Sequence, residues 1–334
     1  MHPFPGRRAW LAVAATATAS SIWFITGGAV LPFEEVLPLL VLLGMLAILY
    51  CLTSIVQLKT GGSVIMERLR LALFGYIFIL IGSNVLSVFN SAVMASALPY
   101  VDANLAKADA FLRFDWISYY TAMVSDDGVS WLFGLAYDSF AYTALFSFML
   151  FCAGGDFTRS RFLVEAFWLS ALLCVVIGMF TPAEGATAFH LEDAVAPEVF
   201  ATLPGTHYLD YLDRVRTAWP LTVRLQDLQG LTTFPSFHTA GSVVVACSFW
   251  RTRLFLPAAL CAGVTIVATP VYGGHYLVDL LGGCAVAIAS LLTLASLPSY
   301  KRLFAATGVR QDRRGCLPGR PVLQRRGATG SSVS

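Results

Sequence analysis

Long apolar runs alternate with short polar connections along most of the chain. A helix of about twenty apolar residues crosses the ~30 Å hydrocarbon core of a bilayer. Eight runs of suitable length and hydropathy lie at residues 9–30, 37–57, 71–98, 131–152, 162–180, 235–250, 254–271 and 276–297. The pattern therefore predicts an all-α fold, a polytopic membrane helix bundle with about eight transmembrane helices.

Three stretches interrupt this pattern. Residues 102–128 mix acidic and aromatic side chains at helical spacing, which predicts an amphipathic helix along the membrane surface. Residues 183–233 form the longest polar connection, which we expect to be functional or to contain helices of its own. Residues 299–334 are rich in Arg, Gly and Ser and are predicted to be a disordered basic tail.

Composition and charge support this interpretation. The 334 residues are 57% hydrophobic and 13% charged, whereas soluble domains carry about 25% charged residues. With a cytoplasmic N-terminus, 17 of the 22 Lys and Arg residues fall in cytoplasmic segments, as the positive-inside rule requires. This places both termini in the cytoplasm and predicts an integral membrane protein, most consistent with a bacterial inner membrane. The seven cysteines, six of them in apolar runs, predict no structural disulfide.

Candidate chemistry is concentrated at the outer ends of two predicted spans. His238 begins the sixth span and His275 the eighth, so both fall on the same face of the membrane. Asp279 lies four residues after His275 and shares its helix face. A carboxylate in an apolar span is costly unless it is paired. Asp279 would fix the tautomer of His275 and leave its other ring nitrogen free as nucleophile or base; a purely structural His–Asp hydrogen bond is the alternative.

The surroundings of these residues suit a phosphate group. Ser236 precedes a helix start whose free backbone N–H groups attract anions. Gly273 and Gly274 would let the backbone approach a ligand closely. Two imidazoles, one carboxylate and two helix starts favour phosphoryl transfer, in which one histidine attacks phosphorus and the other protonates the departing oxygen.

Two motifs resemble those of the type-2 phosphatidic acid phosphatase superfamily. They are Phe234-Pro-Ser-Phe-His238 and Gly274-His275-Tyr-Leu-Val-Asp279, and they are most similar to the branch containing inositol phosphorylceramide synthase. The resemblance implies that His275 forms a phosphohistidine, that Asp279 orients it, and that His238 is the acid and then the base. It implies no metal and no cofactor. It also implies a six-helix phosphatase-like core at residues 71–298, to which residues 1–70 add two transmembrane helices.

Two features of the phosphatases are missing from the sequence. Their first motif, a lysine seven residues before Arg-Pro, is absent from the expected region, and Ala268 and Thr269 stand where their third motif begins with Ser-Arg. The candidate phosphate-binding groups are therefore Arg224 in the outer loop, Ser236 and Gly274. A solvated or headgroup-facing role for Arg224 is at least equally compatible with its position, and Arg214 and Arg216 have the same two interpretations.

These observations predict an enzyme of the outer leaflet that acts on a phospholipid through a phosphohistidine. A lipid hydroxyl as acceptor makes it a headgroup transferase of inositol phosphorylceramide synthase type, and water makes it a lipid phosphate phosphatase. A proton-coupled transporter using His275 and Asp279, or an inactive lipid-binding relative, is the alternative from another class. His190 and His207 lack a partner at ligand spacing and are predicted to be surface residues.

Overall fold

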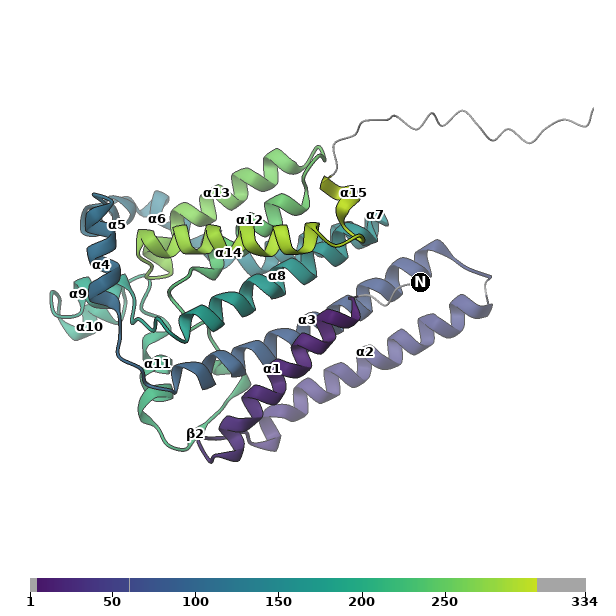
Figure 1. Ribbon diagram of the computed structural model, residues 1–334, viewed down its shortest axis with the longest axis horizontal. Coiled ribbons are helices and arrows are strands. Elements are labelled where there is room, and N and C mark those ends of the chain that lie inside the picture. The colour runs from purple at the N-terminus through teal and green to yellow at the C-terminus, as the bar shows by residue number, and fades with distance from the viewer. Residues whose placement is uncertain (1–4, 60, 305–334) are drawn as a thin grey trace, which may run out of the picture.

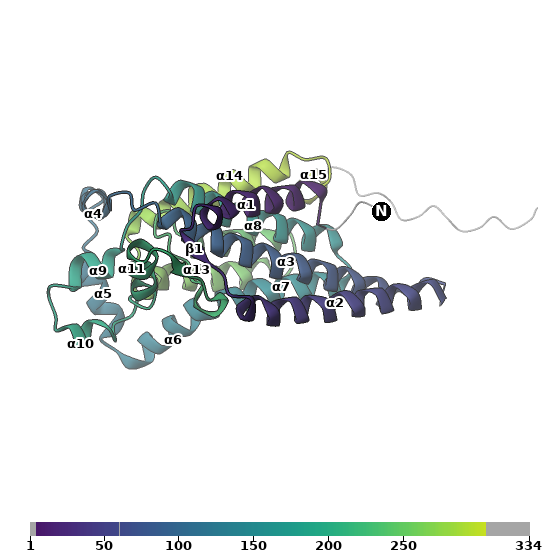
Figure 2. The same cartoon turned by 90° about the horizontal axis from the view of Figure 1, so that it is seen from below.

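The computed structural model describes residues 5–59 and 61–304, and these residues are almost entirely helical. The long helices α1 (Arg7–Ile25), α2 (Phe33–Lys59), α3 (Val64–Met94) and α8 (Phe157–Gly178) run side by side with the C-terminal α12 (Phe237–Ser248), α13 (Phe255–Tyr272) and α14 (Leu277–Ala295) (Figure 1). Short helices gather at one end of this bundle in both views (Figure 2). The beginning of α1 and the short helix α15 (Lys301–Phe304) lie at the other end.

The predicted all-α membrane bundle is confirmed, although fewer helices than expected have the dimensions of a span. In the described part of the chain, five helices are long and apolar enough to cross a membrane: α2, α3, α8, α13 and α14. Helices α6 (Asp127–Asp138) and α7 (Phe140–Gly154) together make a sixth, bent by 51°. The other two predicted spans correspond to α1, which contains four Ser and Thr residues, and to α12, whose 12 residues rise only about 18 Å.

The core of the bundle is built around α8 and α12. Phe162 and Val244 from these helices are fully buried, and α3, α7 and α14 pack around them. Helix α2, by contrast, packs mainly on α3 and leaves most of its apolar side chains exposed, as expected for a helix that faces lipid. The N-terminal helices therefore attach to the rest of the protein mainly through α3.

The surface stretch at 102–128 is divided rather than continuous. Helix α4 (Asp102–Phe111) ends before Arg113, whose φ of 58° does not continue a helix, and α5 (Trp116–Val124) starts with Asp115 as its N-cap. The beginning of α6 occupies the end of this stretch. The single amphipathic helix predicted here was therefore wrong, because an Asx cap and a left-handed residue interrupt the apolar periodicity.

The long connection at 183–233 contains short elements, as predicted. They are α9 (Ala186–Leu191), α10 (Pro197–Phe200), α11 (Leu209–Thr217), β2 (Leu221–Thr222) and the 3₁₀ helix η1 (Leu225–Asp227). Strand β2 pairs in parallel with β1 (Ala29–Val30), which ties the connection to the loop after α1. The first residues of the predicted disordered tail at 299–334 are part of the folded structure. Tyr300 is buried, and its hydroxyl donates a hydrogen bond to Glu165 at 2.8 Å. Residues 305–334, including Cys316, lie outside the described residues.

Candidate active site

The turn between α13 and α14 carries the candidate nucleophile. Gly274 has φ of +64°, a conformation that glycine adopts without strain, and a Cβ there would lie 2.7 Å from the carbonyl oxygen of Gly205. A Cβ on Gly273 would lie 2.6 Å from the imidazole of His275. Both glycines are therefore needed, one for the shape of the turn and one to leave room for the histidine ring.

His275 is fixed by its partner on α14. Its Nδ1 lies 3.0 Å from Oδ2 of Asp279, and both side chains are buried. The same carboxylate oxygen accepts the backbone N–H of Tyr276 at 3.0 Å. With Nδ1 donating to the carboxylate, the lone pair of His275 is on Nε2, as a nucleophilic histidine requires. The predicted pairing of His275 with Asp279 is present.

The backbone of the turn is held from both sides. The carbonyl of His275 accepts a hydrogen bond from the indole of Trp116 at 3.0 Å, and its N–H donates to the carbonyl of Pro270 at 3.1 Å. Trp116 opens α5, so one of the short surface helices contacts the turn directly. These bonds fix the backbone of His275, and together with the Asp279 contact they hold its ring in position before any substrate arrives.

Two buried carboxylates on α4 complete this support. Asp109 accepts the backbone N–H groups of Leu277 and Val278 at 2.8 and 2.9 Å, and so caps α14. Asp102, seven residues earlier on the same face, accepts the N–H groups of Glu184 and Gly185 and the hydroxyl of Tyr276. Burial raises the pKa of Asp109, and the two amide bonds act in the opposite direction. Sequence reasoning missed this role, since it treated these aspartates only as part of a surface helix.

His238 lies at the start of α12, next to the same turn. The N–H of Ser236 donates to the carbonyl of Asp279 at 3.0 Å, which joins the beginnings of α12 and α14. The ring of Tyr137 stacks on His238 with 4.1 Å between centroids, and a Cβ on Gly273 would be 2.9 Å from the Tyr137 hydroxyl. Tyr137 therefore packs between His238 and Gly273 of the turn that carries His275. The structure brings His238, His275 and Asp279 to one end of the bundle.

The three candidate phosphate-binding groups occupy different environments. Ser236 is fully buried and its hydroxyl accepts the N–H of Thr239 at 3.3 Å, as a helix N-cap does. The carbonyl of Gly274 accepts the N–H of Ala186 at 2.6 Å, within the turn that carries His275. Arg224 is exposed just after β2, and β2 lies by the ends of α1 and α2, away from the beginning of α14 (Figure 1).

The other two outer-loop arginines are engaged away from the histidines. Arg214 pairs with Asp227 at 3.4 Å, and its guanidinium lies over Tyr211. Arg216 lies 3.9 Å above the ring of Tyr100 and donates to the carbonyl of Leu98. Both arginines therefore stabilise the packing of α11.

Two histidines predicted to be surface residues have specific surroundings. His190 stacks on Trp116 with 5.2 Å between centroids, beneath the turn that carries His275. Partial burial lowers the pKa of His207; the carboxylate of Asp138 opposes this shift, and a charge on His275 adds to it. His207 is exposed, and its ring packs edge-on against Tyr208. Its electrostatic interaction with His238 and His275 indicates a third imidazole in the neighbourhood of the pair. Neither relationship has a spacing signal in the sequence.

Comparison with known proteins identifies the family. The family model of the PAP2 superfamily matches residues 103–293, more than half of the chain. This range contains α4 except its first residue, Asp102, and the whole His238–His275–Asp279 cluster, and it begins after α3 has ended. No significant match was found among curated proteins or among solved structures. In the described residues, no group of three or more His, Cys, Asp or Glu side chains has the arrangement of a metal site. The chain belongs to the PAP2 superfamily.

Proposed function

We propose that this membrane protein transfers or hydrolyses the phosphate-linked headgroup of a phospholipid through a phosphohistidine on His275. The observation that carries the proposal is the 3.0 Å contact between Nδ1 of His275 and Asp279, in a turn that Tyr137 connects to His238. Membership of the PAP2 superfamily supports an enzyme of phosphatase or phosphotransferase type that acts on a lipid phosphate.

In the first step, Nε2 of His275 attacks phosphorus and the bond from phosphorus to the leaving alcohol breaks. Protonated His238 donates its proton to the departing oxygen, so that a neutral alcohol leaves. Asp279 stabilises the positive charge that develops on the imidazole of His275 as the phosphorus–nitrogen bond forms.

In the second step, His238 is neutral and accepts a proton from the incoming hydroxyl group. The hydroxyl oxygen attacks phosphorus, the phosphorus–nitrogen bond breaks, and His275 returns to its neutral form. Water as the acceptor yields free phosphate or a phosphate monoester, and a lipid alcohol yields a new phosphodiester.

We favour the lipid alcohol as acceptor, which makes the protein a headgroup transferase of the inositol phosphorylceramide synthase type. The replacement of the phosphatase Ser-Arg pair by Ala268 and Thr269 supports this branch. The separation of charges along the chain supports an active site on the extracytoplasmic face, with both termini in the cytoplasm, and a bacterial inner membrane. Ser236 and Gly274 remain the candidate contacts to the phosphate, whereas Arg224 lies away from the turn that carries His275 (Figure 1). His207 adds a solvent-accessible imidazole as a further candidate.

The proposal is tested by tracing the phosphorus atom of the headgroup from the substrate to its products. Purified protein in detergent receives a phospholipid labelled at its headgroup phosphorus, and label is measured on the protein, in free phosphate and in any second lipid. Wild type is compared with His275→Ala, with Asp279→Asn and with Asp127→Asn, an exposed aspartate on α6 that serves as the matched control.

We expect acid-labile label on wild type and on Asp127→Asn, and none on His275→Ala. Asp279→Asn should label at least about 100-fold more slowly, because the tautomer and charge of His275 are no longer fixed. Transfer of label to a second lipid supports the transferase, and release as free phosphate supports the phosphatase. Turnover by His275→Ala at the wild-type rate would rule out the proposed nucleophile, and the absence of both label and turnover in wild type would favour a transporter or an inactive relative.

A further inference from the structure

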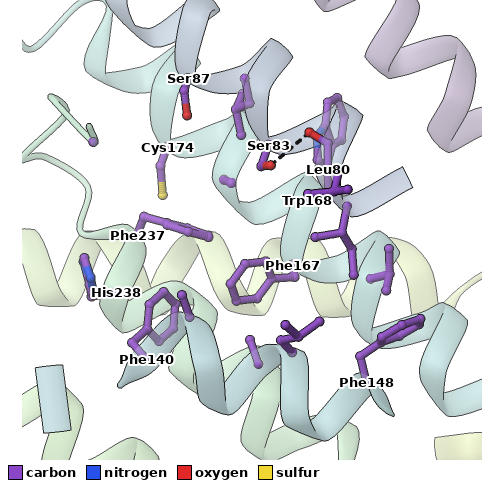
Figure 3. Close-up of a pocket in the computed structure, with 18 of the residues that line it drawn as sticks. Leu80, Ser83, Ser87, Phe140, Phe148, Phe167, Trp168, Cys174, Phe237 and His238 are labelled. Carbon is purple, nitrogen blue, oxygen red and sulfur yellow. Dashed lines mark hydrogen bonds between the residues drawn. The ribbon is translucent and has the colours of Figure 1, made fainter. Parts of the chain in front are cut away.

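A large, partly open apolar cavity lies between helices of the bundle next to His238. Its volume is about 570 Å³, within the range of sites that hold small organic ligands. Helices α3, α7, α8 and α12 line it, together with Gly230 and Thr232 from the outer connection. Figure 3 shows His238 at one edge of the cavity, flanked by Phe140 and Phe237, with Trp168 and Phe148 further along.

The cavity follows the helices for much of the depth of a membrane. On α3 its lining extends from Asn90 to Tyr76, which is roughly 21 Å along a helix. Asn90 lies at the end where it accepts a hydrogen bond from Thr232 at 2.8 Å, close to where α12 begins. One leaflet of the hydrocarbon core is about 15 Å thick. The cavity is therefore long enough to enclose an extended hydrocarbon chain of the outer leaflet.

Its chemistry matches a hydrocarbon chain with a hydroxyl group at one end. Among the described residues, no Asp, Glu, Lys or Arg side chain lines it, and two of the polar groups of α3 are used locally: Ser83 donates to the carbonyl of Leu80, and Asn90 accepts from Thr232. Of the described residues that line the cavity, His238 alone carries an imidazole. A long apolar channel that ends at one proton-transferring group suits a lipid alcohol whose oxygen meets His238.

We infer that the cavity binds the hydrocarbon chain of the lipid alcohol that exchanges its proton with His238, first as leaving group and then as acceptor. The inference rests on the proposed function for the role of His238. One wall comes from α3, which precedes the part of the chain matched by the superfamily. Helix α3 thus completes the chain-binding site and selects the length and shape of the lipid alcohol.

Photolabelling tests whether the hydrocarbon chain binds in the cavity, and it does not depend on catalytic turnover. His275→Ala protein in lipid nanodiscs is mixed with a long-chain diacylglycerol that carries a photoactivatable diazirine at the end of one chain. After illumination, labelled peptides are identified by mass spectrometry. The blocking variant is Ala144→Trp, because Ala144 on α7 lines the cavity, and the control is Ala47→Trp, because Ala47 is exposed on α2.

We expect label on α3 and α7 peptides that lie along the cavity, reduced at least about tenfold by Ala144→Trp and unchanged by Ala47→Trp. Each methylene that loses its burial weakens binding by up to roughly fourfold. Label confined to α2 and other lipid-facing surfaces, or cavity label that Ala144→Trp does not reduce, would overturn the inference. If Ala144→Trp does not fold, the position of the label in the parent protein decides the question.

Turnover by the otherwise wild-type enzyme gives a second measurement. Ala144→Trp should lower kcat/KM for dioleoyl phosphatidic acid at least about tenfold and leave the value for the short-chain dibutyryl lipid within about twofold. Equal losses for both chain lengths would contradict a chain site. Failure of the phosphohistidine mechanism would instead remove turnover of both lipids in wild type while leaving the photolabelling pattern intact.

Discussion

The two histidines of the site are held in different ways. His275 is 4% exposed, and hydrogen bonds fix its ring, its carbonyl and its N–H. His238 is held by aromatic packing: Tyr137 stacks on one side at 4.1 Å and Phe140 lies 4.8 Å away. Among the described residues, none forms a hydrogen bond with the ring of His238, which is held by these ring contacts.

This difference matches the two proposed roles. A nucleophile gains from a fixed orientation, because it must meet phosphorus at one angle. An acid that becomes a base must exchange its proton with the substrate, so its nitrogens need to be available to an alcohol oxygen. The polar support is concentrated at the turn of α14, and the apolar cavity opens beside α12. In the proposed mechanism, the polar turn would bind the phosphate and the apolar cavity would bind the hydrocarbon chain.

The largest expected effect separates the two histidines by leaving group. His275→Ala should lower kcat for every phosphate ester, by about 10³-fold or more, because the nucleophile is lost. His238→Ala should cost about 10²–10⁴-fold for an alkyl ester and far less for a nitrophenyl ester, whose leaving group departs without a proton. Initial rates with both esters provide the measurement, and equal losses for both esters in His238→Ala would contradict its role as the acid.

The next effect tests the space around the nucleophile. Gly273 has φ of −100°, so alanine fits the backbone there, but its Cβ would be 2.6 Å from the ring of His275. Gly273→Ala should displace the ring and lower the rate of phosphohistidine formation by about 100-fold. Gly263→Ala on α13 is the matched control, since a Cβ there meets nothing within 4 Å. Wild-type labelling by Gly273→Ala would show that the ring is less constrained than its contacts indicate.

Much of this site could be predicted from sequence because its signals are local. The four-residue spacing of His275 and Asp279 places both side chains on one helix face. His238 begins the sixth predicted span and His275 the eighth, so both histidines must lie on the same side of the membrane. The packing of α4 against the start of α14 has no such signal. Asp109 is 168 residues from Leu277, and an aspartate in a short surface helix is typical of a solvated position.

The bend in the fourth predicted span was equally hidden. Residues 131–152 are continuously apolar, yet α6 ends at Asp138 and α7 starts at Phe140. The break turns Tyr137 and Phe140 toward His238, where both rings pack against it. Hydropathy reports the solvent that a segment prefers and carries no information about a kink that tertiary contacts stabilise.

A smaller effect is expected from the support under α14. In Asp109→Asn, only one side-chain oxygen remains to accept the N–H groups of Leu277 and Val278. The new NH2 group would face the other N–H, donor against donor. We expect a loss of about 0.5–2 kcal/mol in stability, typical of a lost N-cap. The rate of phosphohistidine formation should fall by about tenfold as the turn loosens.

Asp126→Asn serves as the control for this variant, because Asp126 caps α6 at an exposed position far along the helix from Tyr137. It should lose a comparable amount of stability and keep its labelling rate. If both variants label equally slowly, the contribution of Asp109 is general stability and does not concern the position of His275.

The smallest effect concerns His190, beneath the turn. Burial lowers its pKa below the usual 6.5, and the carboxylates of Asp109, Asp115 and Asp102 oppose this shift. As the pH falls through about 6.5, the unfolded chain binds this proton before the folded protein does, so the folded state loses stability in acid. Thermal unfolding in detergent, measured from about pH 8 to about pH 5, should show that His190→Gln reduces the acid-dependent fall in melting temperature, by less than about 2 °C. A steeper fall in His190→Gln would mean that the folded protein takes up the proton more readily than the unfolded chain. In that case the neighbouring aspartates would outweigh burial, and the phosphate side of the site would be more polar than its stacked rings indicate.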